Sequence, residues 1–80
     1  MTIQVRVRLT FPEPLVREPV LSRALRMFPV EINIRRADVG EDQGWILCEI
    51  DGEPSVVEGT IGWFRETGVQ VDLLGDVLEG

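Results

Sequence analysis

The sequence lacks several residue types on which enzymes and metal sites commonly depend. It contains no histidine and no tyrosine, and all eight of its basic residues are arginine. Without histidine it has neither the commonest general base nor the commonest metal ligand. Its single cysteine, Cys48, excludes an internal disulfide and any zinc or iron–sulfur site built from several cysteines. No nucleophile is accompanied by a base, so we expect no enzyme, no cofactor and no metal site.

Long hydrophobic runs are also missing. No apolar stretch approaches the roughly 20 residues of a membrane-spanning helix. The first residues alternate between apolar and polar, which predicts neither a signal peptide nor a membrane anchor. The net charge of −6 disfavours nucleic acids and anionic membranes, because both attract cationic surfaces. We therefore expect a cytoplasmic protein that binds no nucleic acid and does not insert into a membrane.

The length of 80 residues predicts a single domain, with a core of about residues 3–74 and a short acidic tail at 75–80. Hydrophobic residues make up 44% of the chain, which is ordinary for a globular protein. A domain of this size buries only about 60% of its unfolded surface, so its stability is small. Association with a second copy is one way to add stability, and we expect a homodimer.

One pattern of secondary structure occurs twice. Each half contains an alternating strand, a helix that starts at an acidic residue followed by proline, and a second alternating strand. The segments are 3–9, 18–28 and 30–34 in the first half, and 45–51, 54–66 and 69–73 in the second. Two such units predict an α+β, ferredoxin-like β-α-β-β-α-β sandwich. Its antiparallel four-stranded sheet should have the order 4-1-3-2, with both helices on one face.

Each helix carries an apolar stripe that should face the sheet. Phe28 ends the stripe of the first helix and Phe64 that of the second, so we expect both rings to be buried. Cys48 falls on the helix-facing side of its strand and is expected to be an inert core residue. The polar residues 36–43 predict the turn that connects the strand at residues 30–34 to the strand at residues 45–51.

The other face of the sheet has no helix to cover it. Strand parity places on this face Arg6, Arg8, Asn33, Arg35, Trp45, Leu47 and Glu49. Trp45 and Leu47 are apolar, which predicts a dimer interface or a lid over a ligand. Alternatively, the tail at residues 76–78 folds back and covers them.

The segment from Glu18 to Val39 resembles the NIL domain family. Glu-Pro-Val-Leu-Ser-Arg is followed by an apolar helix end and by Val-Glu-Ile-Asn-Ile at residues 30–34. The family is named for an Asn-Ile-Leu tripeptide, which Asn33 and Ile34 match and from which Arg35 departs. The Arg-Glu-x-Gly-Val turn at residues 65–69 also fits, and the resemblance covers about residues 5–74.

The resemblance implies a regulatory function. NIL domains occur at the C-terminus of methionine-importer ATPases, where they bind methionine and restrain transport, and as short stand-alone proteins, which this chain resembles. It implies a ligand site at Asn33, Ile34, Arg35 and Arg36. Because an arginine replaces the leucine, an anionic or acidic analogue should suit this site better than methionine.

Two interpretations of function remain. In the first, the chain is a small-molecule-sensing regulatory domain that binds an amino acid or small carboxylate near the second strand and a dimer boundary. In the second, it is a ligand-free interaction module that docks onto a transporter ATPase or a redox partner. The arginines themselves allow two interpretations, because Arg35 and Arg36, with Arg6 and Arg8, either form an anion site or pair with Glu49 and other acids across the strands.

Overall fold

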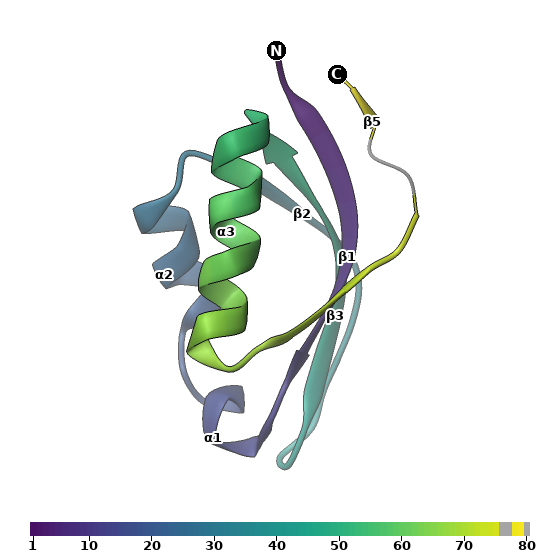
Figure 1. Ribbon diagram of the computed structural model, residues 1–80. Helices are drawn as coiled ribbons and strands as arrows, with labels where there is room; N and C mark the ends of the chain where they lie inside the picture. The colour runs from purple at the N-terminus through teal and green to yellow at the C-terminus, as the bar shows by residue number, and fades with distance from the viewer. Residues whose placement is uncertain (76–77, 80) are drawn as a thin grey trace.

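The computed structural model describes residues 1–75 and 78–79, the latter pair by its backbone alone. Its elements, drawn in Figure 1, are β1 (Ile3–Phe11), α1 (Glu13–Val16), α2 (Val20–Met27), β2 (Glu31–Val39), β3 (Gly44–Gly52), α3 (Pro54–Thr67), β4 (Gln70–Leu73) and β5 (Leu78–Glu79). Helices α2 and α3 lie on one face of the sheet, and nothing in Figure 1 covers the other face of β2, β3 and β1 among the described residues. The expected two-layer α+β architecture is confirmed.

The sheet has the order β2-β3-β1-β4, and every pairing within it is antiparallel. This is the predicted 4-1-3-2 topology. Strand β5 pairs with Ile3 and Gln4 of β1, beyond the point where β4 ends, in a part of the chain that was expected to be only an acidic tail. The prediction that residues 76–78 cover Trp45 concerns residues 76 and 77 and the side chain of 78, which lie outside the described part.

The core lies between the sheet and α3. Alternate residues of β1 face it, and each stands opposite an apolar residue of β3: Val5 opposite Ile50, Val7 opposite Cys48, and Leu9 opposite Ile46. The period of two along each strand puts all six side chains on the helix-covered side. All six are buried, as the alternation predicted.

Helix α3 follows the sequence signals closely. Pro54 opens it after Glu53, and its stripe buries Val57, Thr60 and Phe64. The Thr60 hydroxyl donates a hydrogen bond of 2.8 Å to the carbonyl of Val56, so its burial leaves no polar atom unpaired. Gly68 ends the helix with a φ of 110°, the left-handed conformation that favours glycine.

The first helical stripe is less deeply buried than expected. Helix α2 ends at Met27, and Phe28 is already extended because Pro29 follows it. The Phe28 ring is half-buried and meets the edge of Trp63, with 6.3 Å between ring centroids. Leu25 is 48% exposed. Burial of Phe64 is confirmed, whereas full burial of Phe28 was a wrong prediction.

Two further expectations need correction. Residues 36–39 belong to β2, so the turn at residues 40–43 is much shorter than the polar run suggested. Gly40 closes this turn by donating its N–H to the carbonyl of Gln43 at 2.9 Å. The short helix α1, which follows Pro12, has no apolar stripe of its own and was not predicted.

Candidate functional site

Strand β2 carries the four residues predicted to bind a ligand, and it forms the outer edge of the sheet. Asn33 stands opposite Glu49 of β3, on the face without helices, while Ile34 stands opposite Cys48 and points to the helix side. A β-bulge between Ile34 and Arg36 inserts Arg35 as an extra residue. The structure therefore does not bring all four together, because Ile34 lies on the opposite face.

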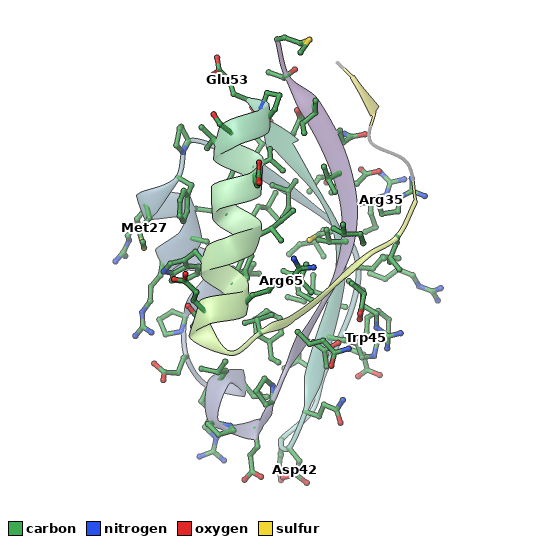
Figure 2. All side chains as sticks on the ribbon, viewed as in Figure 1. Met27, Arg35, Asp42, Trp45, Glu53 and Arg65 are labelled. Carbon is green, nitrogen blue, oxygen red and sulfur yellow. The ribbon has the colours of Figure 1, made fainter. Side chains whose placement is uncertain are left out.

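The bulge changes which side chains share a face. Arg36 is placed opposite Leu47, so it lies on the helix-free face even though it follows Arg35 directly. Arg35 reaches the same face, and Figure 2 shows it on the side of the sheet away from the helices. Without the bulge two consecutive residues would point in opposite directions. Arg35 and Arg36 thus lie on one face together with Asn33.

Glu49 is the centre of this face. Its residue is only 7% exposed, although it lies on the side of the sheet without helices. Arg6 approaches the Glu49 carboxylate at 3.2 Å, and Arg35 approaches its other oxygen at 3.9 Å. A buried carboxylate requires such partners, and the hydrogen bond from Arg6 supplies one. The cross-strand pairing of these arginines with Glu49 is therefore present.

Arg35 is held much more loosely than Arg6. Its side chain is 57% exposed, and its distance to Glu49 is beyond hydrogen-bond range. A guanidinium carries five N–H donors in a planar fork. Most of those of Arg35 therefore face solvent and remain available to an anion.

Trp45 and Leu47 lie beside this group on β3. Arg8 stacks over the Trp45 ring, with its guanidinium carbon 4.8 Å from the ring centroid. Leu47 lies between Arg8 on β1 and Arg36 on β2. Both apolar side chains are half-buried, and Arg8 covers part of the Trp45 ring. Their predicted role in a dimer interface stays a prediction.

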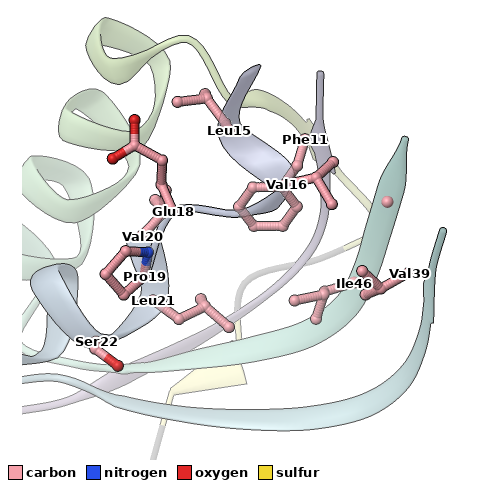
Figure 3. Close-up of a pocket in the computed structure, with 11 residues that line it drawn as sticks. Phe11, Leu15, Val16, Glu18, Pro19, Val20, Leu21, Ser22, Val39 and Ile46 are labelled. Atoms are coloured by element: carbon pink, nitrogen blue, oxygen red, sulfur yellow. The ribbon is translucent and has the colours of Figure 1, made fainter. Parts of the chain in front are cut away.

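A separate apolar pocket opens on the helix side of the sheet. It has a volume of about 230 Å³, and Figure 3 shows Phe11, Val16, Leu21, Val39 and Ile46 around it. One wall is formed by Leu15, Val16, Glu18 and Pro19, from the segment that connects β1 to α2. The volume suits an amino-acid side chain better than a drug-sized ligand, for which pockets of about 300–1,000 Å³ are usual.

Cys48 lies on the helix-facing side of β3, fully buried. Burial, and secondarily the negative charge of Glu49, raise the pKa of its thiol to about 11. A thiol with such a pKa is protonated at neutral pH and is a poor nucleophile. In residues 1–75 and 78–79 no three His, Cys, Asp or Glu side chains gather as metal ligands would. None of the helices in that part of the chain has the length and apolar character needed to cross a bilayer.

Comparison with known proteins identifies the family. The family model of the NIL domain matches residues 5–72. The chain belongs to the NIL domain family. Its relatives include the methionine import ATP-binding proteins MetN of Photorhabdus laumondii, 33% identical over 75 residues, and of Vibrio cholerae, 32% identical over 76 residues. These alignments cover 89% and 90% of this NIL domain but only 22% of each relative.

Solved structures support the fold of this NIL domain. The C-terminal domain of an ABC transporter ATP-binding protein from Enterococcus faecalis superposes with a TM-score of 0.77 and 21% identity, over 90% of this chain and 84% of that one. The designed protein Foldit4 superposes with a TM-score of 0.60 and 15% identity, over 100% and 99% of the two chains. At these identities the likeness concerns the fold alone.

Three features of the NIL domain site were not found from sequence. Pairing of the arginines with Glu49 was one of the two interpretations, but strand parity gave no sign that the Glu49 carboxylate on this open face is buried. The bulge at Arg35 has no signature in a run of polar residues on an edge strand. The apolar pocket depends on how residues 12–19 cross the end of the sheet, and the only available signal was their three prolines.

Proposed function

We propose that this NIL domain is a small-molecule-sensing regulatory module that binds an amino acid or small carboxylate beside β2. The proposal rests on one observation, that neighbouring side chains bind the Arg35 guanidinium only weakly. Its guanidinium is largely exposed and lies 3.9 Å from Glu49, on the same face as Asn33. This gives the site a strong anion-binding group that is positioned by the fold but only weakly engaged.

The chemistry of the neighbouring groups suits an amino acid. Arg35 would bind a carboxylate through two parallel N–H groups, which is the geometry that makes such pairs specific. Asn33 offers both a donor and an acceptor, so its amide can bind an ammonium or a second carboxylate. Arg36 adds positive charge on the same face. An acidic amino acid would use more of these groups than methionine.

The regulatory part of the proposal is supported by the relatives. Their names assign them to methionine import, and one solved structure with the same fold is the C-terminal domain of a transporter ATP-binding protein. A ligand controls such a system only if it binds one state more tightly than another. We propose that the ligand lies near a boundary between two copies and favours the paired state.

A thermal-shift screen tests the binding site. L-Glutamate, succinate and L-methionine are added to the chain and to its Asn33→Ala and Arg35→Leu variants. A ligand at about 100 times its Kd adds about 2.7 kcal/mol of stability, which for a domain of this size raises Tm by roughly 10–20 °C. We expect glutamate or succinate to raise Tm, and Arg35→Leu to remove most of that rise. Arg26→Leu, an exposed arginine on α2, is the matched control and should behave as the unaltered chain.

Two results would contradict the assigned site. If methionine raises Tm equally in all variants, and Leu21→Trp abolishes the effect, the ligand occupies the apolar pocket instead. If no amino acid or carboxylate raises Tm at millimolar concentration, the sensing proposal fails. The second candidate function would then apply, in which the Arg35–Glu49 pair is structural and the helix-free face docks onto a transporter ATPase or redox partner.

A further inference from the structure

Another groove lies between α3 and the sheet, at the point where β4 ends. Its sheet side is formed by Ile3, Val5 and Leu73, and its other side by α3. The volume is about 540 Å³, within the usual range of small-molecule pockets. We call it the α3 groove. Its described lining residues all differ from those of the apolar pocket at Leu21, and none belongs to the helix-free face at Arg35.

The α3 groove is open on its sheet side because β4 is short. Strand β4 pairs with β1 from Val7 to Thr10 and ends at Leu73, so the helix-facing residues Val5 and Ile3 lie beyond its end. Leu73 stands opposite Val7, which places it on the helix-facing side as well, yet it is 56% exposed. An apolar side chain that faces the helix layer without being covered is available to a ligand.

Helix α3 turns a second stripe toward the groove, beside the stripe that fills the core. Its members recur at the three- and four-residue spacing of one helix face: Pro54, Val57, Glu58, Ile61, Gly62 and Arg65. The stripe is about 16 Å long, given a rise of 1.5 Å per residue. A Cβ built on Gly62 would meet nothing within 4 Å, so packing does not require a glycine there, although glycine lowers helix stability. Its missing side chain leaves the middle of the groove unobstructed.

The two charged groups of the groove lie far apart. Arg65 is exposed, and Figure 2 shows it on the side of α3 that faces β4. One of its N–H groups donates to the carbonyl of Val71 at 3.2 Å, and Arg65 forms no ion pair in the part of the chain that the structure describes. A guanidinium has five N–H donors, so several remain for an anion. Glu58 precedes Arg65 by seven residues, which is about 10 Å along the helix axis.

We propose that the α3 groove binds an aliphatic carboxylate of medium chain length, with its carboxylate on Arg65 and its alkyl chain along Ile61 and Leu73. The charges define the ligand and its direction. Arg65 attracts the carboxylate, and Glu58 repels it from the other part of the groove. An α-amino acid does not fit this pattern, because its ammonium and carboxylate lie on one carbon and cannot reach both Glu58 and Arg65. The site does not depend on the sensing site proposed at Arg35.

A peptide suits the α3 groove less well than an alkyl chain. The apolar side chains of Ile3, Ile61 and Leu73 offer no partners to amide groups, and burial of an amide without a partner is unfavourable. On the adjoining edge of β1, the carbonyl of Arg6 already accepts the N–H of Leu74 at 2.9 Å. An alkyl chain needs no hydrogen-bond partner and is stabilised by burial alone.

Calorimetric titration of hexanoate, octanoate and decanoate, each below its micelle concentration, tests the proposal. If the alkyl chain is buried in the groove, each two added methylenes should tighten binding by about tenfold. Arg65→Gln should weaken decanoate binding by about tenfold or more, because a charged hydrogen-bond donor is lost. Arg35→Leu should leave decanoate binding unchanged, which separates this site from the proposed sensing site.

Gly62→Leu is the sharpest variant, because it places a side chain in the groove. Leucine forms helices better than glycine, so Tm should be unchanged or higher while decanoate binding is lost. Gly59→Ala is the matched control. It also replaces a glycine of α3, but its Cβ would lie 3.6 Å from Cε1 of Phe28, an ordinary contact away from the groove. This control should bind decanoate as the unaltered chain does.

Four results would overturn the proposal. The first is an affinity that does not change with chain length, and the second is decanoate binding that persists in a folded Gly62→Leu variant. The third is loss of binding in Leu21→Trp with none in Gly62→Leu, which would place the ligand in the other pocket. The fourth is binding of a short apolar peptide without any binding of decanoate, which would show that the ligand class is wrong. Circular dichroism and Tm of each variant establish that it is folded.

Discussion

Replacement of Phe64 by alanine is the most direct test of the core. Phe64 is fully buried and is the largest of the completely buried side chains in the described chain. It packs against Trp63, with 5.5 Å between ring centroids, and lies over the helix-covered face of the sheet. Removing a buried phenylalanine costs about 3–5 kcal/mol, since the transfer free energy is lost and a cavity remains.

The size of this loss matters because the domain is small. Stabilities of about 0.05–0.15 kcal/mol per residue correspond to roughly 4–12 kcal/mol for this chain. Phe64→Ala should therefore remove a large part of the total free energy of unfolding. Urea denaturation followed by circular dichroism measures it, with the slope compared between variants to confirm a two-state transition.

Phe28→Ala serves as the comparison in the same experiment. Its ring is half-buried and contacts Trp63 at an edge, so we expect a loss of about half that of Phe64→Ala. Leu25→Ala, at a position that is 48% exposed, should cost less than about 1 kcal/mol. A loss below about 1 kcal/mol for Phe64→Ala, or equal losses for both phenylalanines, would refute this description of the core.

Two further predictions concern Cys48 and Gly68. The pKa of Cys48 is raised from 9.0 to about 11 in the folded state, so the thiol of the unfolded chain loses its proton first and the free energy of unfolding should fall between about pH 9 and 11, by roughly 2–3 kcal/mol in total. Urea denaturation at a series of pH values, for the unaltered chain and for Cys48→Ala, measures this fall. Identical pH dependence in the two proteins would contradict the prediction. Gly68→Ala should lower the free energy of unfolding by about 1 kcal/mol or more, because φ at this position is 110° and the added Cβ would lie 3.4 Å from Cδ1 of Leu15. An unchanged Tm would show that a side chain at the end of α3 causes no strain.

The topology could be predicted because its signals are redundant. Two strand-helix-strand units, each with an acidic residue and proline at the helix start, leave few alternatives once connections are right-handed. Alternation in β1 and β3 specifies the buried face, and a slip of one residue would expose it. The helix α3 was predicted well for the same reason, since its stripe, its first-turn proline and Gly68 agree.

The errors fall where burial does not constrain the sequence. Most of β2 is exposed on both faces, so residues 36–39, in which charged and apolar side chains alternate, resembled a turn although they form a strand. Phe28 fits the periodic stripe, but Pro29 ends the helix before the ring can turn inward. The candidate residue Asn33 came from the resemblance alone, whereas Arg35 also belonged to the arginines that strand parity placed on the helix-free face.

Calorimetric titration of L-glutamate tests the central claim of ligand sensing at Arg35 most directly. The titration is made into the unaltered chain, into Arg35→Leu and into the Arg26→Leu control. We predict saturable binding to the unaltered chain and to the control, with affinity lost or strongly reduced in Arg35→Leu because the guanidinium that binds the carboxylate is gone. Saturable binding of equal affinity in all three proteins would contradict the claim, as would the absence of binding to the unaltered chain at millimolar concentration.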